Sequence, residues 1–128
     1  MKFANFKAIM KTDNILQTKS YQFALDIIVL FKQLQKRKEF VLSKQLMRSG
    51  TAVGALVEEA IGGQSSKDFI HKMSIAYKEA RETKYWLRLL RDSEYLTHDE
   101  TEPYLNNAEE LLRIIGSIQK TMKSRIIS

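Results

Sequence analysis

Apolar residues recur at helical spacing along several segments of the chain, and this pattern predicts the fold. The clearest case is the segment 65–91, where spacings of four and three alternate along Phe69, Met73, Ala76, Ala80, Thr83, Leu87 and Leu90. The segment that begins near Thr101 repeats the pattern with Leu105, Ala108, Leu112, Ile115, Gln119, Met122 and Ile126. Such heptad seams are typical of long helices that pack at small crossing angles.

Two further helices are expected nearer the N-terminus. Residues 20–36 carry a stripe that is wide enough for burial on two sides, formed by Phe23, Ile27, Phe31 and Leu34 with apolar neighbours. Residues 39–61 carry a narrower apolar face. Helices at 20–36, 39–61, 65–91 and 101–124 with short connections predict an all-α fold, an antiparallel up-down-up-down, left-handed four-helix bundle. Residues 1–18 lack sustained periodicity and are expected to form a flexible arm, with Met10 as an alternative start.

Gly50 and Gly54 lie inside the predicted helix 39–61, one turn apart. Each glycine costs about 1 kcal/mol relative to alanine in a helix interior, so two of them need a reason. The simplest reason is that a helix without side chains at these positions lets a second helix approach closely. The pair Gly62-Gly63 is expected to end this helix in a left-handed C-cap, and Ser65 or Ser66 to cap the next one.

Charge is distributed unevenly along the chain. The net charge is +6, and residues 1–38 hold eight Lys and Arg against two Asp. In an up-down bundle one end would gather the cations Lys2, Lys7, Lys11, Lys19, Lys67, Lys120, Lys123 and Arg125. We hypothesise that this end contacts RNA or an acidic partner, mainly through phosphates. Ordinary solubilising charge that complements helix dipoles explains the pattern equally well.

The residues around the two glycines resemble a known family. The matching positions are Gln45, Leu46, Arg48, Ser49, Val53, Ala55 and Glu59, followed by 64–69 and 75–87. Over roughly residues 20–120 the chain resembles the four-helix bundle proteins of the 23S ribosomal RNA intervening-sequence family, small bacterial proteins of which some are encoded inside insertions in ribosomal RNA genes. Ala52 and Leu56 depart from a family serine and asparagine, which puts any binding role of those polar groups in doubt.

The resemblance implies a homo-oligomer, because known members form ring-like pentamers. One branch, the accessory variability protein of diversity-generating retroelements, is strongly basic and partners a reverse transcriptase. We therefore expect structural roles for Arg48, Gly50, Gly54 and Glu59, with Glu59 paired to Arg48 of a neighbouring chain or to a basic residue of the helix 65–91, or else simply solvated.

Aromatic residues of the helix 65–91 form a further candidate surface. Tyr77, Tyr85 and Trp86 are expected in a subunit interface, because aromatic residues at helical spacing more often serve packing than base stacking. The protein is expected to act as a non-enzymatic oligomeric scaffold or adaptor, associated through a basic surface with RNA or with a nucleic-acid enzyme. The alternative is a protein–protein interaction module that contacts no nucleic acid.

Several function classes find no support in the residues. The chain has no cysteine, and only Asp68 to His71 has the spacing of a di-metal carboxylate helix. No nucleophile–base pair, phosphate loop, cofactor motif or small-molecule site is recognisable. No apolar run approaches the roughly 18 residues of a membrane span, and no secretory signal is apparent, so the expected location is cytoplasmic.

Overall fold

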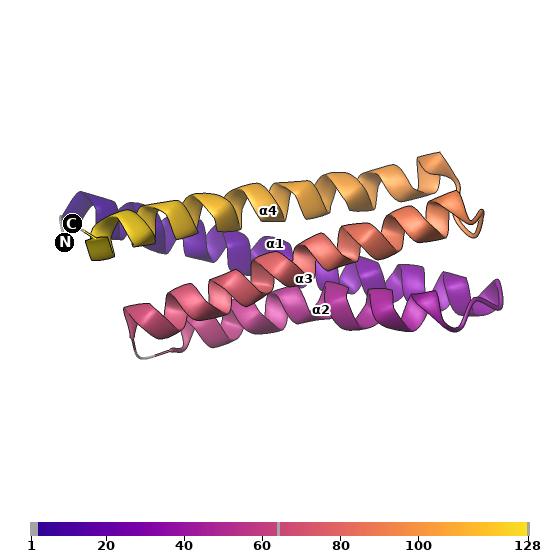
Figure 1. Ribbon diagram of the computed structural model, residues 1–128, viewed down its shortest axis with the longest axis horizontal. Coiled ribbons are helices and arrows are strands. Elements are labelled where there is room, and N and C mark those ends of the chain that lie inside the picture. The colour runs from indigo at the N-terminus through magenta and orange to yellow at the C-terminus, as the bar shows by residue number, and fades with distance from the viewer. Residues whose placement is uncertain (1–2, 64, 128) are drawn as a thin grey trace.

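The residues that the structure describes form four antiparallel helices in chain order. The computed structural model describes the backbone of residues 3–63 and 65–127 and the side chains of residues 15–63 and 65–124. The helices are α1 (Phe3–Lys36), α2 (Leu42–Ile61), α3 (Ser66–Asp92) and α4 (His98–Ile127). Each helix packs against the next, and α4 closes the bundle against α1 (Figure 1). The predicted all-α up-down bundle is confirmed.

The heptad seams form the core. Of the seam residues of α3, six are fully buried: Met73, Ala76, Ala80, Thr83, Leu87 and Leu90. In α4 the buried residues are Ala108, Leu111, Leu112, Ile115, Ile118 and Met122. The 3-4 spacing therefore predicted the buried face of α3 from Met73 to Leu90 and four buried positions of α4, because positions three and four apart lie on one side of a helix. In α4 the seam positions Leu105 and Gln119 are only partly buried, and Leu111 and Ile118, which were expected only to widen the face, are buried.

The two glycines of α2 lie where α1 crosses it most closely. A Cβ atom added at Gly50 would lie 2.8 Å from Cγ1 and 2.9 Å from Cγ2 of Ile27. A Cβ atom added at Gly54 would lie 3.2 Å from the backbone oxygen of Ser20. The expected close helix approach is confirmed, and α1 is the helix that makes it.

Helix α1 is longer than the sequence predicted. It begins at Phe3 rather than near Ser20, so the described backbone from Phe3 onward is helical where a flexible arm 1–18 was expected. The buried face includes Leu16 and Ser20 and continues through Phe23. The stripe was missed because Ser20, which lies one turn after Leu16 and is buried at the contact with Gly54, is polar and interrupts the apolar spacing.

The turn between α1 and α2 explains why α2 begins at Leu42 and not near Glu39. Lys38 adopts a left-handed conformation with φ 63°, which ends α1. Glu39 is buried, and its carboxylate accepts hydrogen bonds from the backbone N–H groups of Val41, Leu42 and Ser43 at 3.1, 2.8 and 2.6 Å. Glu39 therefore caps α2 from outside the helix.

The other helix ends agree with the expectations in part. Gly62 ends α2, but with φ −80°, so the expected left-handed C-cap is wrong. Ser65 caps α3 as expected, because its hydroxyl accepts a hydrogen bond from the Asp68 N–H at 3.0 Å. Helix α4 begins at His98, earlier than predicted. Thr97 and Glu100 form a reciprocal capping box there, with N–H to side-chain distances of 3.1 and 2.9 Å.

Candidate interaction surfaces

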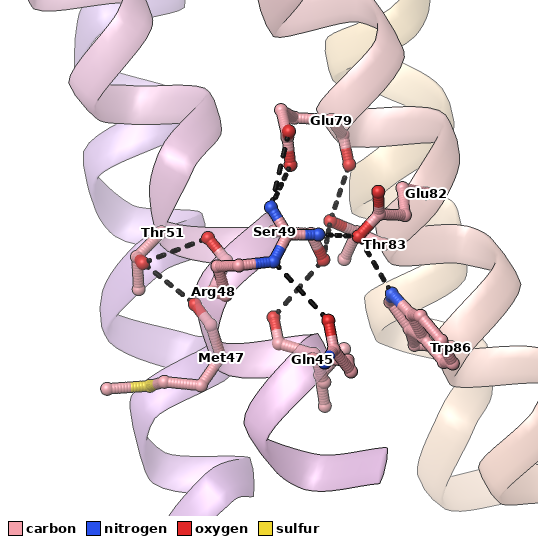
Figure 2. A network of polar contacts seen from close by, with 10 residues as sticks. Gln45, Met47, Arg48, Ser49, Thr51, Glu79, Glu82, Thr83 and Trp86 are labelled. Carbon is pink, nitrogen blue, oxygen red and sulfur yellow. Dashed lines mark hydrogen bonds and ion pairs between the residues drawn. The ribbon is translucent and has the colours of Figure 1, made fainter.

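Arg48 of α2 is the centre of a polar network that joins α2 to α3. Its guanidinium donates to both oxygens of Glu79 at 3.3 and 3.1 Å and to Oε2 of Glu82 (Figure 2). The same Glu82 oxygen accepts a hydrogen bond from the indole N–H of Trp86 at 2.9 Å. Beside this network the hydroxyls of Ser49 and Thr83 are hydrogen-bonded at 2.9 Å. The network therefore gives Arg48 and Ser49 defined partners on α3, whereas the family resemblance identified these two residues only by their positions in the sequence.

Glu59 lies at the other end of the same helix pair. Its carboxylate is 4.0 Å from the ammonium nitrogen of Lys72 on α3, and its side chain is 56% exposed. This is the pairing with a basic residue of α3 that the sequence suggested, and at this distance and exposure it contributes little to stability. Leu56, which replaces a family asparagine, packs against the hydrophobic core.

A second polar network links the two turns at the far end of the bundle. The Arg37 guanidinium donates to both oxygens of Glu100 at 3.0 and 2.5 Å and to the carbonyl oxygen of Tyr95 at 2.8 Å. The hydrogen bonds from Arg37, together with the Thr97 N–H, lower the pKa of Glu100 to about 2. Burial alone would raise the pKa of Glu39, but three backbone N–H donors hold it below its ordinary value.

The cations predicted from the sequence do not all lie on one free surface. Lys67, Lys120 and Lys123 are exposed. Lys19 instead pairs with Glu110 across the α1–α4 contact at 3.2 Å. The predicted contacts at Lys2, Lys7, Lys11 and Arg125 involve side chains outside the described residues.

Four further cations were missed by the sequence reading. Lys78, Arg81 and Arg88 lie on the outward side of α3, and Arg113 lies on the outward side of α4. We call the α3–α4 basic face the set Lys67, Lys78, Arg81, Arg88, Arg113, Lys120 and Lys123. No carboxylate among the described side chains lies within the 4.0 Å ion-pair distance of any of them. The sequence signal that could have found these four residues is their position on the faces of α3 and α4 opposite the apolar heptad seams.

The two helices that carry this face are aligned by contacts between them. Lys84 of α3 pairs with Glu109 of α4, and Gln119 donates to Ser74 Oγ at 3.0 Å. Because α3 and α4 are antiparallel, these two contacts place Arg113 near the level of Arg81. Because all of these cations are exposed, they lie on the outer surfaces of two neighbouring helices.

The three aromatic residues predicted for a subunit interface differ in exposure. Tyr77 and Trp86 are partly buried and pack against the hydrophobic core of their own chain. Tyr85 is 51% exposed, and its ring contacts that of Trp86 edge-to-face with a centroid distance of 5.0 Å and an interplanar angle of 71°. Of the three, Tyr85 has the most surface left for a partner, and the interface prediction itself remains a prediction.

Exposed apolar side chains gather on α1. Tyr21, Leu25 and Val29 follow at spacings of four and are 64%, 41% and 52% exposed. Residues at this spacing form one stripe along a helix. In water such a stripe is an unfavourable surface for an isolated chain, and it is a candidate contact between copies.

Few features of the described residues resemble a catalytic or metal site. A cavity of about 130 Å³ lies between α1 and α4 and is lined by Lys19, Gln22, Phe23, Asp26, Asn107, Glu110 and Leu111. Among the side chains that the structure describes, no three His, Asp or Glu residues come close enough together to hold a metal ion.

None of the helices, over the described part of the chain, combines the length and the apolarity that crossing a bilayer requires.

Comparison with known proteins identifies a family and a similar crystal structure. The family model of the 23S rRNA-intervening sequence protein matches residues 12–117. A crystal structure at 1.70 Å of a protein of unknown function from the S23 ribosomal protein family, from Bacteroides thetaiotaomicron VPI-5482, is 47% identical, with a TM-score of 0.84. The match covers 85% of this chain and 98% of that one. No curated protein matches the chain.

Proposed function

The chain belongs to the 23S rRNA-intervening sequence protein family, and from this membership and its surface we propose a non-enzymatic, self-associating scaffold that binds RNA. The family description names a ribosomal RNA context but no activity. The α3–α4 basic face is the observation that carries the proposal. The cations of this face have no carboxylate partner among the described side chains, whereas Arg37, Arg48 and Lys84 each form an ion pair with a glutamate.

The charge arrangement favours contacts with phosphates rather than with specific bases. Lysine and arginine side chains on a convex helix pair can reach a phosphate backbone by many small adjustments, and each contact releases condensed counterions. Such binding weakens steeply with salt, with a slope of log Kobs against log salt of about −0.7 per phosphate contacted on a single strand.

The test compares two variants with the same change in net charge. One variant replaces three cations of the face, Lys78→Gln, Arg113→Gln and Lys120→Gln. The control replaces three exposed lysines of α1 and α2, Lys32→Gln, Lys36→Gln and Lys44→Gln. Filter binding of a 20-nucleotide RNA is measured between about 50 and 200 mM salt, the range over which phosphate contacts are strongly screened.

We expect the face variant to bind more weakly, with a slope that is shallower by up to roughly 2, which is three contacts at about 0.7 each. The control variant should stay close to the unmodified protein. Equal losses in the two variants would mean that net charge alone acts. RNA retention that is absent or insensitive to salt would end the proposal.

Self-association is proposed from the stripe Tyr21, Leu25 and Val29. A Leu25→Glu substitution would place a carboxylate in the middle of this stripe, which disfavours burial against a second copy. Light scattering of the purified protein should give a mass several times 14.9 kDa, and the variant should fall toward the mass of one chain. A single-chain mass for the unmodified protein would remove this part of the proposal. A pentamer is the assembly that the family resemblance implies.

The second candidate is a protein–protein adaptor whose basic face contacts an acidic protein surface. The same cations support it, and the partner can be a nucleic-acid enzyme such as a reverse transcriptase. Binding to an acidic protein that persists without any RNA retention would favour this candidate over the first.

A further inference from the structure

We propose that Tyr85 is a stacking platform for one unpaired base of a single-stranded nucleic acid, held between two phosphate-binding arginines. This inference rests on the proposed RNA binding and specifies its ligand class. It also revises the expectation that Tyr85 belongs to a subunit interface.

The first observation is that Tyr85 is exposed in the middle of the basic face. Arg81 precedes it by four residues and Arg88 follows it by three, so the three side chains lie on one side of α3. Lys78 lies one further turn along the same side. At about 1.5 Å of rise per residue, Arg81 and Arg88 are roughly 10 Å apart along the helix. They can therefore contact phosphates on either side of a nucleotide that stacks on Tyr85.

The second observation is that contacts to other residues restrain the Tyr85 ring. The ring rests edge-to-face against Trp86 at 5.0 Å, and the Trp86 indole N–H is hydrogen-bonded to Glu82. Glu82 is in turn bound by Arg48 of α2 (Figure 2). A ring that is already oriented loses less conformational entropy when a base stacks on it.

The electrostatic surroundings leave this site positive. Glu79 and Glu82 share the single cation Arg48, so this network keeps one net negative charge against the cations Lys78, Arg81 and Arg88. Glu109 is paired with Lys84. Asp92 is bound by Arg91, although it also interacts electrostatically with Arg88. Arg81 has no carboxylate within 4.0 Å among the described side chains, so the site keeps an excess of positive charge next to an aromatic face.

These features together favour a single strand over the other polyanions. In a duplex the bases are stacked on each other and cannot reach a side chain, whereas an unpaired base presents its face. An acidic peptide would be attracted by the arginines, but its carboxylate side chains do not stack on the exposed ring of Tyr85. Stacking of one base on an aromatic side chain contributes about 1–3 kcal/mol.

The experiment measures binding of a 12-nucleotide oligouridylate and of a 12-base-pair RNA duplex to the full chain. Tyr85→Leu removes the aromatic face but keeps an apolar side chain, and Tyr85→Phe keeps the ring. Tyr21→Leu is the control, because Tyr21 is 64% exposed on α1, outside the basic face. Trp86 is the only tryptophan and touches Tyr85, so its fluorescence provides a second readout.

We expect Tyr85→Leu to weaken oligouridylate binding by about 5- to 150-fold, the fold-change that corresponds to one stacked base. The salt slope should not change, because no phosphate contact is lost. Tyr85→Phe and Tyr21→Leu should remain within about twofold, and duplex binding should be the same in all variants. Oligouridylate should quench Trp86 in the unmodified protein.

Three outcomes overturn the inference, and they are distinguishable. If the unmodified protein binds oligouridylate in a salt-dependent manner and Tyr85→Leu binds equally well, the stacking site is refuted while the proposed function stands. An equal loss for the duplex and the single strand refutes it in the same way. If the unmodified protein binds neither RNA, the proposed function fails and the stacking site fails with it.

Discussion

Replacing Gly50 by alanine tests the close contact between α1 and α2. The added Cβ would lie 2.8 and 2.9 Å from two side-chain carbons of Ile27, closer than atoms of this kind approach in folded proteins. Ile27 is fully buried and branches at Cβ, so both of its Cγ atoms lie against the added methyl group and the side chain cannot turn away without disturbing the core. One of the two helices must therefore shift.

Two opposing terms set the expected change in stability. Alanine in place of glycine stabilises a helix interior by about 1 kcal/mol. Overpacking a core by one methyl group costs about 1–3 kcal/mol. The free energy of unfolding should therefore fall by up to about 2 kcal/mol, because the overpacking term is at least as large as the helix term. At a urea m-value of about 2 kcal/mol/M this lowers the midpoint by up to roughly 1 M.

Gly116 of α4 supplies a matched control. A Cβ added there would meet the nearest atom, Cε2 of Tyr77, at 3.8 Å, which is ordinary contact. Gly116→Ala should therefore raise stability by up to about 1 kcal/mol through helix propensity alone. Urea unfolding at one fixed protein concentration, followed by circular dichroism, compares the two variants. A Gly50→Ala protein that is stabilised as much as Gly116→Ala would refute the close-contact argument.

Three further predictions concern the helix ends and the α2–α3 network. Lys38 and Glu94 have φ of 63° and 68°, so replacing either by glycine should raise the free energy of unfolding by about 0.5–1 kcal/mol, and a lower urea midpoint would contradict this. The pKa of Glu100 is lowered from 4.5 to about 2, so its stabilising contribution is complete above pH 4.5 and lost as the pH falls through 2. Glu100→Gln should cost about 1 kcal/mol at pH 7, after discounting for its 33% exposure, and nothing near pH 2, as judged by urea midpoints at both values. Arg48→Met should cost about 0.5–1 kcal/mol through lost contacts to Glu79 and Glu82, whereas Arg113→Met, without an ion pair among the described residues, should stay within about 0.5; equal effects in thermal melts would refute this difference.

The buried faces could be predicted from the sequence because they depend on a local period. The seam from Met73 to Leu90 was correct residue by residue, and so was the close approach at Gly50 and Gly54. Helix ends were harder, since they depend on polar capping side chains rather than on the spacing of apolar residues. Glu39 lies in the preceding turn and caps α2, so the helix begins at Leu42. The spacing of apolar residues does not reveal this contact.

The candidate surface could be predicted only in part, because the free charge of a side chain depends on its neighbours in space. Lys19 looked free in the sequence, yet Glu110 lies 91 positions away and 3.2 Å from it in the fold. Arg81 and Arg113 are also distant in the sequence, and the antiparallel packing of α3 and α4 brings them to one level. The basic face thus depends on the register of two helices.

Mapping ultraviolet-induced crosslinks between the full-length protein and a single-stranded oligouridylate tests most directly that RNA binds along α3 and α4. We expect crosslinked peptides that contain Tyr85 or lie within residues 78–88 and 113–123, and fewer crosslinks as salt rises. Crosslinks confined to α2, or to the exposed stripe of α1, would contradict this expectation.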